Sequence, residues 1–238
     1  ATEFSEEEYY ETINRTRHIE TLITRHSGIM DRYDPQRKVG LIVDEWGTWY
    51  DVEPGTNPGF LYQQNTMRDA IVAAINLNIF NAHSDRVFMA NIAQAVNVLQ
   101  AILLTEGNVT VKTPTYHVFD LYKEHQDAEL IYSHVENNTA YGNIPCISHS
   151  ASIAENGTVT LTLSNCSLDK EFSADIGAAF GEISTADGRI LTGEVHALNT
   201  FDHPENVTIK PFGVKTENGR AAVVIPPCSV MAVTITLK

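Results

Sequence analysis

The sequence predicts an α/β region followed by an all-β region, and two observations lead to this fold class. First, the short apolar runs at residues 39–43 and 86–90 each precede a helical pattern, as the buried strands of a parallel sheet do. Second, from residue 129 onward, β-branched runs alternate with turn sequences at the spacing of an antiparallel sandwich or jelly roll. We therefore expect two parts, 1–128 and 129–238, with no flexible linker between them.

The composition narrows the class of protein. With 238 residues, 43% of them apolar, the chain is globular rather than disordered. No apolar run approaches the roughly 20 residues that span a bilayer. A formal net charge of −14 argues against nucleic acid and anionic membranes as partners, since both attract basic surfaces. The three cysteines lack metal-binding spacing, so we interpret them as buried free thiols and expect neither a metal nor a cofactor.

The N-terminal stretch carries a helix start signal. Ser5 and Glu8 fit a capping box, and the apolar spacing beyond them predicts a helix to about residue 26. A second, short helical piece at 29–33 is expected to end before Pro35, ahead of the strand at 39–43.

After that strand, the Pro- and Gly-rich residues 51–59 predict a loop, and apolar residues at helical spacing predict a helix over 62–80. Beyond the strand at 86–90 we expect an apolar helix at 95–104. Pro114 at a first helical position predicts a further helix to about residue 125.

In the second part, alternating runs predict strands and polar tripeptides predict turns between them. The expected strands are 158–163, 194–198, 221–225 and 230–237. The expected turns are at 155–157, 186–188, 217–219 and 226–227.

The first apolar run ends in a carboxylate cluster walled by aromatic residues. Asp44 and Glu45 follow it directly, and Trp46, Trp49 and Tyr50 lie within one short loop. In parallel α/β folds, and above all in barrels, the C-terminal ends of strands carry the chemistry. Aromatic rings stack on the apolar faces of sugars, and a glycosidase needs a carboxylate as nucleophile or base. The pattern favours sugar chemistry, with a solvated carboxylate that caps the next helix as the alternative.

Several segments together make a more specific match. The nucleophile-like segment Asp44-Glu45-Trp46-Gly47-Thr48-Trp49-Tyr50 and the segments at 54–64, 91–100 and 113–119 resemble the α-L-arabinofuranosidases of glycoside hydrolase family 51. The resemblance covers residues 1–128 closely and the remainder more loosely. Because proteins of that family are about twice this length, the chain looks like their C-terminal half.

The resemblance implies a fold and site residues. Residues 1–128 would supply the last two βα units of a (β/α)8 barrel, and 129–238 a jelly-roll-like β-sandwich beside it. Glu45 would be the catalytic nucleophile of a retaining mechanism. Trp49 would line the sugar subsite, Gln94 would orient the substrate by hydrogen bonding, and Leu61 would form an apolar wall. Asp44 would point the other way and support the site, because side chains alternate along a strand.

The resemblance also implies partners. Two strands cannot close a barrel, and the family's acid/base glutamate, which follows an Asn on an earlier strand, has no counterpart here. We therefore expect the chain to act with a missing N-terminal barrel half, and to be inactive alone. The substrate would be a terminal arabinofuranosyl residue of arabinoxylan, arabinan or a derived oligosaccharide. The resemblance further implies a cytoplasmic homo-oligomer.

Two other interpretations stay open at this point. The chain can be a non-catalytic module that binds carbohydrate or mediates oligomerisation. It can also belong to a related barrel glycosidase such as a xylosidase or endoglucanase, because the sequence indicates the reaction type better than the sugar. His83 and His117 are left out of the site, since each lies in a stretch whose simplest role is structural.

Overall fold

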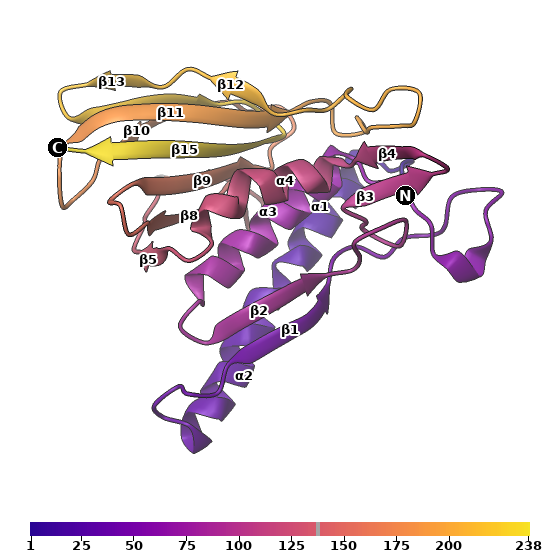
Figure 1. The fold of residues 1–238 in the computed structure, drawn as a ribbon, viewed down its shortest axis with the longest axis horizontal. Coiled ribbons are helices and arrows are strands. Elements are labelled where there is room, and N and C mark those ends of the chain that lie inside the picture. Colours follow the sequence, from indigo (N-terminus) through magenta and orange to yellow (C-terminus); the bar gives the residue numbers. More distant parts are fainter. Residues whose placement is uncertain (137–138) are drawn as a thin grey trace.

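The computed structural model describes residues 1–136 and 139–238. A helical layer lies between a two-stranded parallel sheet on one side and a larger antiparallel sheet on the other (Figure 1). The α-helices are α1 (Glu6–Thr16), α2 (His18–Tyr33), α3 (Met67–Ala82) and α4 (Pro114–Tyr122), and the 3-10 helices are η1 (Pro58–Phe60) and η2 (Lys123–His125). The strands of the first 131 residues are β1 (Leu41–Trp46), β2 (Val87–Ile92), β3 (Leu103–Glu106), β4 (Val109–Lys112) and β5 (Glu129–Ile131). The later strands are β6 (Ala140–Tyr141), β7 (Ile144–Pro145), β8 (Ile147–Ile153), β9 (Val159–Asn165), β10 (Phe172–Ile176), β11 (Ile183–Thr192), β12 (Lys210–Phe212), β13 (Lys215–Glu217), β14 (Arg220–Ile225) and β15 (Ser229–Leu237).

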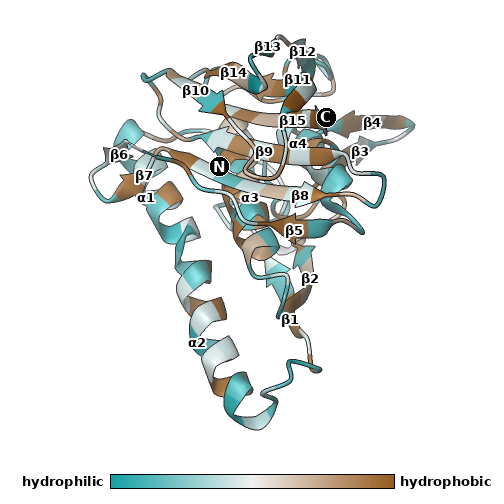
Figure 2. Ribbon diagram, turned by 90° about the vertical axis from the view of Figure 1, so that its left-hand side faces the viewer, coloured by the Kyte–Doolittle hydropathy of each residue, from teal (hydrophilic) through white to brown (hydrophobic). Residues whose placement is uncertain are grey.

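The first helix starts where the sequence predicts, but the break between the two helices lies earlier than predicted. The capping box of α1 is confirmed: the Ser5 N–H donates to Glu8 Oε2 at 2.7 Å, and the Glu8 N–H donates to Ser5 Oγ at 3.2 Å. The helix is interrupted at Arg17, and α2 then runs unbroken from His18 to Tyr33. The sequence instead predicted a helix to about residue 26 and a separate piece at 29–33. Gly28 lies inside α2 and does not end the helix. Figure 2 shows α2 projecting away from the sheets.

Helix α3 is the centre of the helical layer. Thirteen of its sixteen residues are buried, so the helix is covered on nearly every face, as helices inside a core are. It begins at Met67, five residues later than predicted, because Thr66 and Asp69 form a second capping box. It contacts α1, α2 and α4, and on the sheet side β8, β9 and β15.

The antiparallel part consists of two facing sheets. A six-stranded sheet has the order β12-β11-β15-β9-β8-β5, and a three-stranded sheet has the order β10-β14-β13. Apolar side chains from both sheets form one core between them, including Leu163, Val223, Ile225, Met231 and Val233. Face-to-face association of this kind places alternate residues of each strand in the core.

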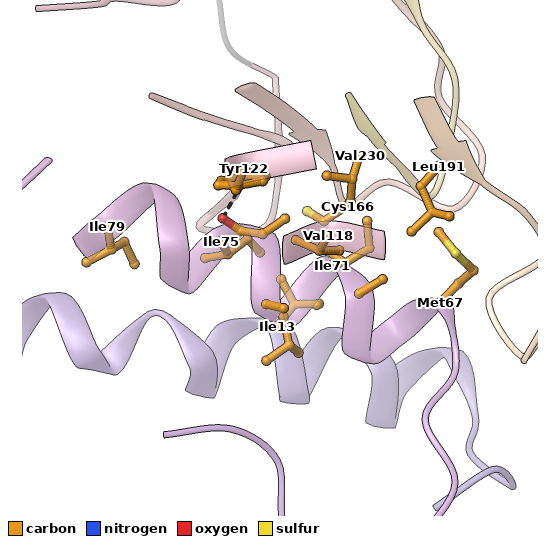
Figure 3. Packing of buried hydrophobic residues seen from close by; sticks show 14 of the residues in the cluster. Ile13, Met67, Ile71, Ile75, Ile79, Val118, Tyr122, Cys166, Leu191 and Val230 are labelled. Atoms are coloured by element: carbon orange, nitrogen blue, oxygen red, sulfur yellow. Dashed lines mark hydrogen bonds between the residues drawn. The ribbon is translucent and has the colours of Figure 1, made fainter. Parts of the chain in front are cut away.

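The other face of the six-stranded sheet packs on the helices. Ile13 of α1, Ile71 and Ile75 of α3, and Val118 of α4 meet Leu191 and Val230 of the sheet in a second core (Figure 3). Buried Tyr122 donates its hydroxyl to the Ala74 carbonyl at 3.2 Å within this core. This second core joins residues from both sides of position 128.

The cysteines agree with the sequence interpretation. Cys146, Cys166 and Cys228 are free and buried. Burial raises the pKa of the Cys166 and Cys228 thiols to about 12, so both stay protonated and unreactive at neutral pH.

The parallel pair β1–β2 is covered on one face. Leu41, Val43, Ala90 and Ile92 pack against the helical core. The large apolar residues Val39, Ile42, Phe88 and Met89 are instead 51–60% exposed. Among the residues described, no third strand pairs with either member. The prediction of a strand buried on both faces is therefore wrong for this chain taken alone.

Three further sequence predictions are wrong. Residues 95–104 form no helix: Asn97 and Leu99 adopt left-handed φ values of 59° and 51°, and β3 then pairs with β4. Residues 186–188 lie inside β11 rather than in a turn, paired with β15. Residues 194–198 form no strand, since the carbonyls of Val195 and Ala197 accept from the first N–H groups of α3 instead.

Arg86 ties the start of β2 to the end of α2, at the far end of the parallel pair from Glu45. Its side chain is 1% exposed and donates to Asp34 Oδ2 at 2.9 Å, Asp31 Oδ1 at 2.5 Å and the Val39 carbonyl at 2.8 Å. His83 lies beside it in sequence and contacts Glu20 at 2.6 Å.

Candidate active site

The predicted nucleophile lies at the C-terminal end of β1. Asp44 and Glu45 are both exposed, while Trp46 is buried against the rings of Phe80 and Phe119. The pairing of β1 with β2 shifts register between Val43 and Trp46. This irregularity interrupts strict alternation at the two carboxylates, so the opposite orientation of Asp44 stays a prediction.

The end of β2 lies directly beside this point. The Ala93 N–H donates to the Trp46 carbonyl at 2.8 Å, so Glu45 and Gln94 each adjoin one member of a hydrogen-bonded pair. The Gln94 N–H donates to the Val98 carbonyl, and the Gln94 carbonyl accepts the Ile102 N–H, both at 3.1 Å. Gln94 itself is exposed. The structure thus brings the backbones of two predicted site residues together across the parallel pair.

The other two predicted residues lie on the loops above the strands. Trp49 is 68% exposed, so its ring is open to solvent rather than part of the core. Leu61 is half-buried with a left-handed φ of 53°, and its carbonyl accepts the Leu99 N–H at 2.9 Å. That bond connects the loop after β1 to the loop after β2.

Beneath these loops lies a buried polar cluster that the sequence analysis missed. We call it the loop frame: Thr48, Gln63, Asp69, Gln100 and Thr115, all at most 8% exposed. Gln100 Oε1 accepts the Thr48 N–H at 2.9 Å, and its Nε2 donates to the Asp69 carbonyl at 2.8 Å and Thr115 Oγ1 at 3.1 Å. Thr48 Oγ1 donates to Asp69 Oδ1 at 2.9 Å. Gln63 Oε1 accepts the Tyr50 N–H at 2.8 Å, and its Nε2 donates to the Thr48 carbonyl at 3.3 Å.

Two neighbouring charged residues lie in this region: Asp69, whose pKa is shifted by burial, and Arg68, which contacts aromatic rings. Burial raises the pKa of the Asp69 carboxyl, and Arg68, Thr66 and Thr48 oppose that shift only in part. The Arg68 guanidinium lies between two aromatic rings, 4.0 Å from the centre of Phe4 and 3.8 Å from that of Tyr50.

His117 is structural by position. It lies on α4 and is 8% exposed, and burial lowers the pKa of its imidazole. Its Nε2 is buried without a hydrogen-bond partner among the residues the structure describes.

Two surface hollows lie away from the predicted residues. One of about 520 Å³ is lined by Thr2, Glu3, Phe4, Glu53, Gln64, His196 and Leu198. The other, of about 400 Å³, is lined by His196, Ala197, Leu198, Thr200, His203 and Asn206. Glu45 lines neither of these two hollows. Within 1–136 and 139–238, no three His, Cys, Asp or Glu residues are grouped so as to hold a metal ion. None of the helices in that part of the chain has the length and apolar character to cross a membrane.

Comparison with known proteins decides the family. The model of the alpha-L-arabinofuranosidase C-terminal domain matches residues 44–229, which is most of the chain and begins at Asp44. The chain belongs to this family.

Relatives of this arabinofuranosidase domain confirm the resemblance to the C-terminal half of glycoside hydrolase family 51. The intracellular exo-alpha-L-arabinofuranosidase of Bacteroides ovatus is 40% identical over 99% of this chain and 47% of its own length. The crystal structure of a GH51 arabinofuranosidase from Xanthomonas axonopodis pv. citri superposes with a TM-score of 0.94 and 41% identity, over 98% of this chain and 48% of that one. The arabinose complex of the Thermotoga maritima enzyme gives a TM-score of 0.85 at 26% identity, over 96% and 50%. The chain thus spans about half the length of the relatives it matches.

Only one part of the loop frame, the position of Asp69 at a helix start, could be predicted from a local sequence pattern. Thr66 and Asp69 have capping-box spacing, which was readable in advance. Thr48 and Gln100 are 52 residues apart, and nothing local marks them as partners.

Proposed function

We propose that this chain carries the nucleophile of a retaining α-L-arabinofuranosidase. The observation that carries the proposal is the position of Glu45: an exposed carboxylate at the C-terminal end of a parallel strand, inside the region that matches the family model. The substrates are terminal arabinofuranosyl residues of arabinoxylan, arabinan or derived oligosaccharides. The names of the relatives, an exo-alpha-L-arabinofuranosidase and an arabinofuranosidase in complex with arabinose, support the arabinofuranosyl group and do not name a polymer.

In this mechanism Glu45 attacks the anomeric carbon of the arabinofuranosyl ring and forms a covalent glycosyl–enzyme. A second carboxyl, about 5–5.5 Å away in retaining enzymes, protonates the departing oxygen and then activates the water that releases the sugar. Trp49 offers an exposed ring on which a furanose face can stack. Gln94 orients the sugar hydroxyls by hydrogen bonding, and Leu61 supplies an apolar wall.

The second carboxyl comes from a missing upstream segment, and the chain alone is inactive. In this proposal β1 and β2 are the last two strands of a (β/α)8 barrel within residues 1–128, and 129–238 is a jelly-roll-like sandwich. Exposed Ile42, Phe88 and Met89 support it, because a barrel interior filled by apolar side chains would cover them. The full enzyme is a cytoplasmic homo-oligomer, a location for which the intracellular relative is the support.

The proposal is tested by trapping the covalent intermediate. The intact protein, meaning this chain together with the proposed upstream segment, is incubated with a mechanism-based arabinofuranosyl inactivator. The modified peptide is then identified by mass spectrometry. We expect the added mass on the peptide that contains Glu45, and none on a Glu45→Gln variant. Labelling of a different carboxylate would refute the assignment.

Incompleteness of the chain is tested separately. Residues 1–238 alone are assayed on an arabinan oligosaccharide and on an activated aryl arabinofuranoside, and the upstream segment is then added in trans. We expect no turnover of the oligosaccharide without the upstream segment. Full activity of 1–238 alone would show that the second carboxyl lies within this sequence.

A further inference from the structure

We propose that Thr48 and Gln100 are positioning residues, which fix the backbone between Glu45 and Trp49 so that the carboxylate and the ring meet the same sugar. This inference rests on the proposed role of Glu45. It assigns a function to the loop frame, whose members are buried or nearly so and are not themselves among the predicted site residues.

The backbone that needs positioning is short. Trp46 is anchored by the aromatic rings of the helical core, and its carbonyl accepts from Ala93. Gly47 then adopts a φ of +131°, a conformation that side-chain-bearing residues rarely take. A side-chain carbon at Gly47 would also stand 3.2 Å from Gln100 Oε1, so the loop passes close over the Gln100 amide. Glu45 and Trp49 therefore flank, in sequence, a turn that lies against Gln100.

Gln100 acts as the bridge between that turn and the rigid helices. Its Oε1 accepts from Thr48, and its Nε2 donates both to the Asp69 carbonyl, in the first turn of α3, and to Thr115 in the first turn of α4. Gln100 is 0% exposed, so its amide has no water to replace these partners. Hydrogen bonds through Gln100 thus connect the turn to the first turns of two helices rather than to another loop.

Asp69 completes the arrangement from below. One carboxylate oxygen accepts from Thr48 Oγ1 at 2.9 Å, and the other accepts the Thr66 N–H at 2.8 Å as part of the α3 capping box. A buried carboxylate between two directional donors holds the Thr48 side chain in one rotamer. Simple closure of the core would need only apolar side chains here. A network of directional hydrogen bonds instead fixes where the backbone lies.

The test uses isosteric substitutions in the intact protein. Thr48→Val keeps the shape and removes the hydroxyl that reaches Asp69, and Thr48→Ser keeps the hydroxyl. Thr162→Val is the matched control, because Thr162 is also buried and its hydroxyl bonds to Asn78 within the six-stranded sheet interface, with no contact to the loop. The readouts are the labelling rate of Glu45 by the inactivator, kcat and KM on an aryl arabinofuranoside, and the melting temperature.

We expect Thr48→Val to slow Glu45 labelling and kcat by roughly 10- to 100-fold, with KM changed by less than about threefold. Misplacement of a reacting group by about 1 Å has costs of this size. Thr48→Ser should restore most of the rate. The control should lower the melting temperature to a similar extent while it leaves the labelling rate unchanged. If Thr48→Val labels as fast as Thr162→Val, the positioning role is wrong.

A second variant covers the case in which Thr48→Val does not fold. Thr115→Val removes only the outermost bond, from Gln100 Nε2, and should slow labelling by roughly threefold or more. An unchanged rate in folded Thr115→Val would contradict the bridge through Gln100. Failure of the underlying function is distinguishable from both results, since the wild-type protein would then be labelled at a residue other than Glu45.

Discussion

The six-stranded sheet and the β1–β2 pair are built from similar apolar residues but differ in how they are covered. The six-stranded sheet has a core on each face, one shared with the helices and one with the three-stranded sheet. The parallel pair has a core on one face, and Ile42, Phe88 and Met89 lie open on the other. The carboxylates of the candidate site belong to the open region. The difference shows that, within this chain, the helices and the three-stranded sheet cover the six-stranded sheet on both faces, whereas the parallel pair is covered on one face only.

The contrast also separates two kinds of polar burial. In the sheet region, Asn78 of α3 bonds to Ser150 and Thr162, which joins the helix to the sheet. In the open region, the loop frame bonds to the backbone of the loop that follows Glu45. The first cluster fixes one layer on another, and the second fixes a loop on a layer. Mutations in the two clusters should therefore have different phenotypes.

The largest expected effect is on chemistry in the open region. Glu45→Gln is nearly isosteric and removes the nucleophilic charge, so in the intact protein we expect kcat to fall on the order of 10⁴-fold or more. The melting temperature should stay within a few degrees of wild type, because Glu45 is exposed. Steady-state assays with an aryl arabinofuranoside and a thermal melt measure both. Retention of more than a few per cent of kcat would mean that another residue is the nucleophile.

A pair of core substitutions compares the two regions directly. Leu191→Ala, at a fully buried position of β11, should cost about 3 kcal/mol of unfolding free energy. Ile42 is 51% exposed here, but in the intact protein Ile42→Ala should cost about as much if upstream strands cover it. Urea denaturation of both variants of the intact protein gives the comparison. A cost below about 1 kcal/mol for Ile42→Ala would contradict a covered face.

Stability of the sheet region should depend on pH through His125. Its two ring nitrogens contact Ser152 Oγ at 2.7 Å and Thr162 Oγ1 at 3.0 Å, and burial lowers its pKa from 6.5 to about 4. The unfolded chain therefore takes up a proton at a higher pH than the folded chain does. The stabilisation is complete above about pH 6.5 and is lost as the pH falls from 6.5 towards 4, by about 2 kcal/mol at pH 5.

The check is to measure unfolding free energy against pH for wild type and for His125→Gln, which does not titrate. The difference between the two curves isolates His125 from the carboxylates, including Asp69, whose raised pKa acts in the opposite direction. Parallel curves between pH 7 and 4.5 would show that His125 does not titrate in this window.

The smallest expected effect is at Trp49. Because the ring is 68% exposed, Trp49→Ala should leave the melting temperature unchanged. Loss of a ring that stacks on the sugar should lower kcat/KM by roughly tenfold, mostly through KM, equivalent to 1–2 kcal/mol. Trp49→Phe, which keeps an aromatic face, should recover part of the loss. Unchanged kinetics for Trp49→Ala would remove the ring from the substrate site.

Structural features were predictable from the sequence when their physical cause lay in residues close together along the chain. The capping box at Ser5 and the start of α4 at Pro114 were predictable because each rests on residues within one helical turn. The strand at 230–237 was predictable from alternation and is observed as β15.

The failures have non-local causes. Residues 95–104 are apolar enough for a helix, but the bonds between the Asn97 side chain and Thr105 hold an open turn ahead of β3. Residues 194–198 look like a strand, yet their carbonyls serve the start of α3, more than 120 residues earlier in the chain. At the candidate site, Glu45 was visible as a strand-end carboxylate. Gln100 was not, because its role depends on contacts with residues 48, 69 and 115.

The burial of α3 is completed by a strand that is synthesised much later. Nearly every face of α3 is buried, and part of its cover is β15, which ends at Leu237, 155 residues after α3 ends at Ala82. On the ribosome, α1 and α2 are already synthesised when α3 is completed, but the part of α3 that β15 covers stays open for roughly ten to thirty seconds of further synthesis. During that interval its apolar surface is open to chaperones and to other nascent chains. The step at which this protein is most exposed to aggregation is thus set by the arrangement of its layers, and it occurs before the last strand leaves the exit tunnel.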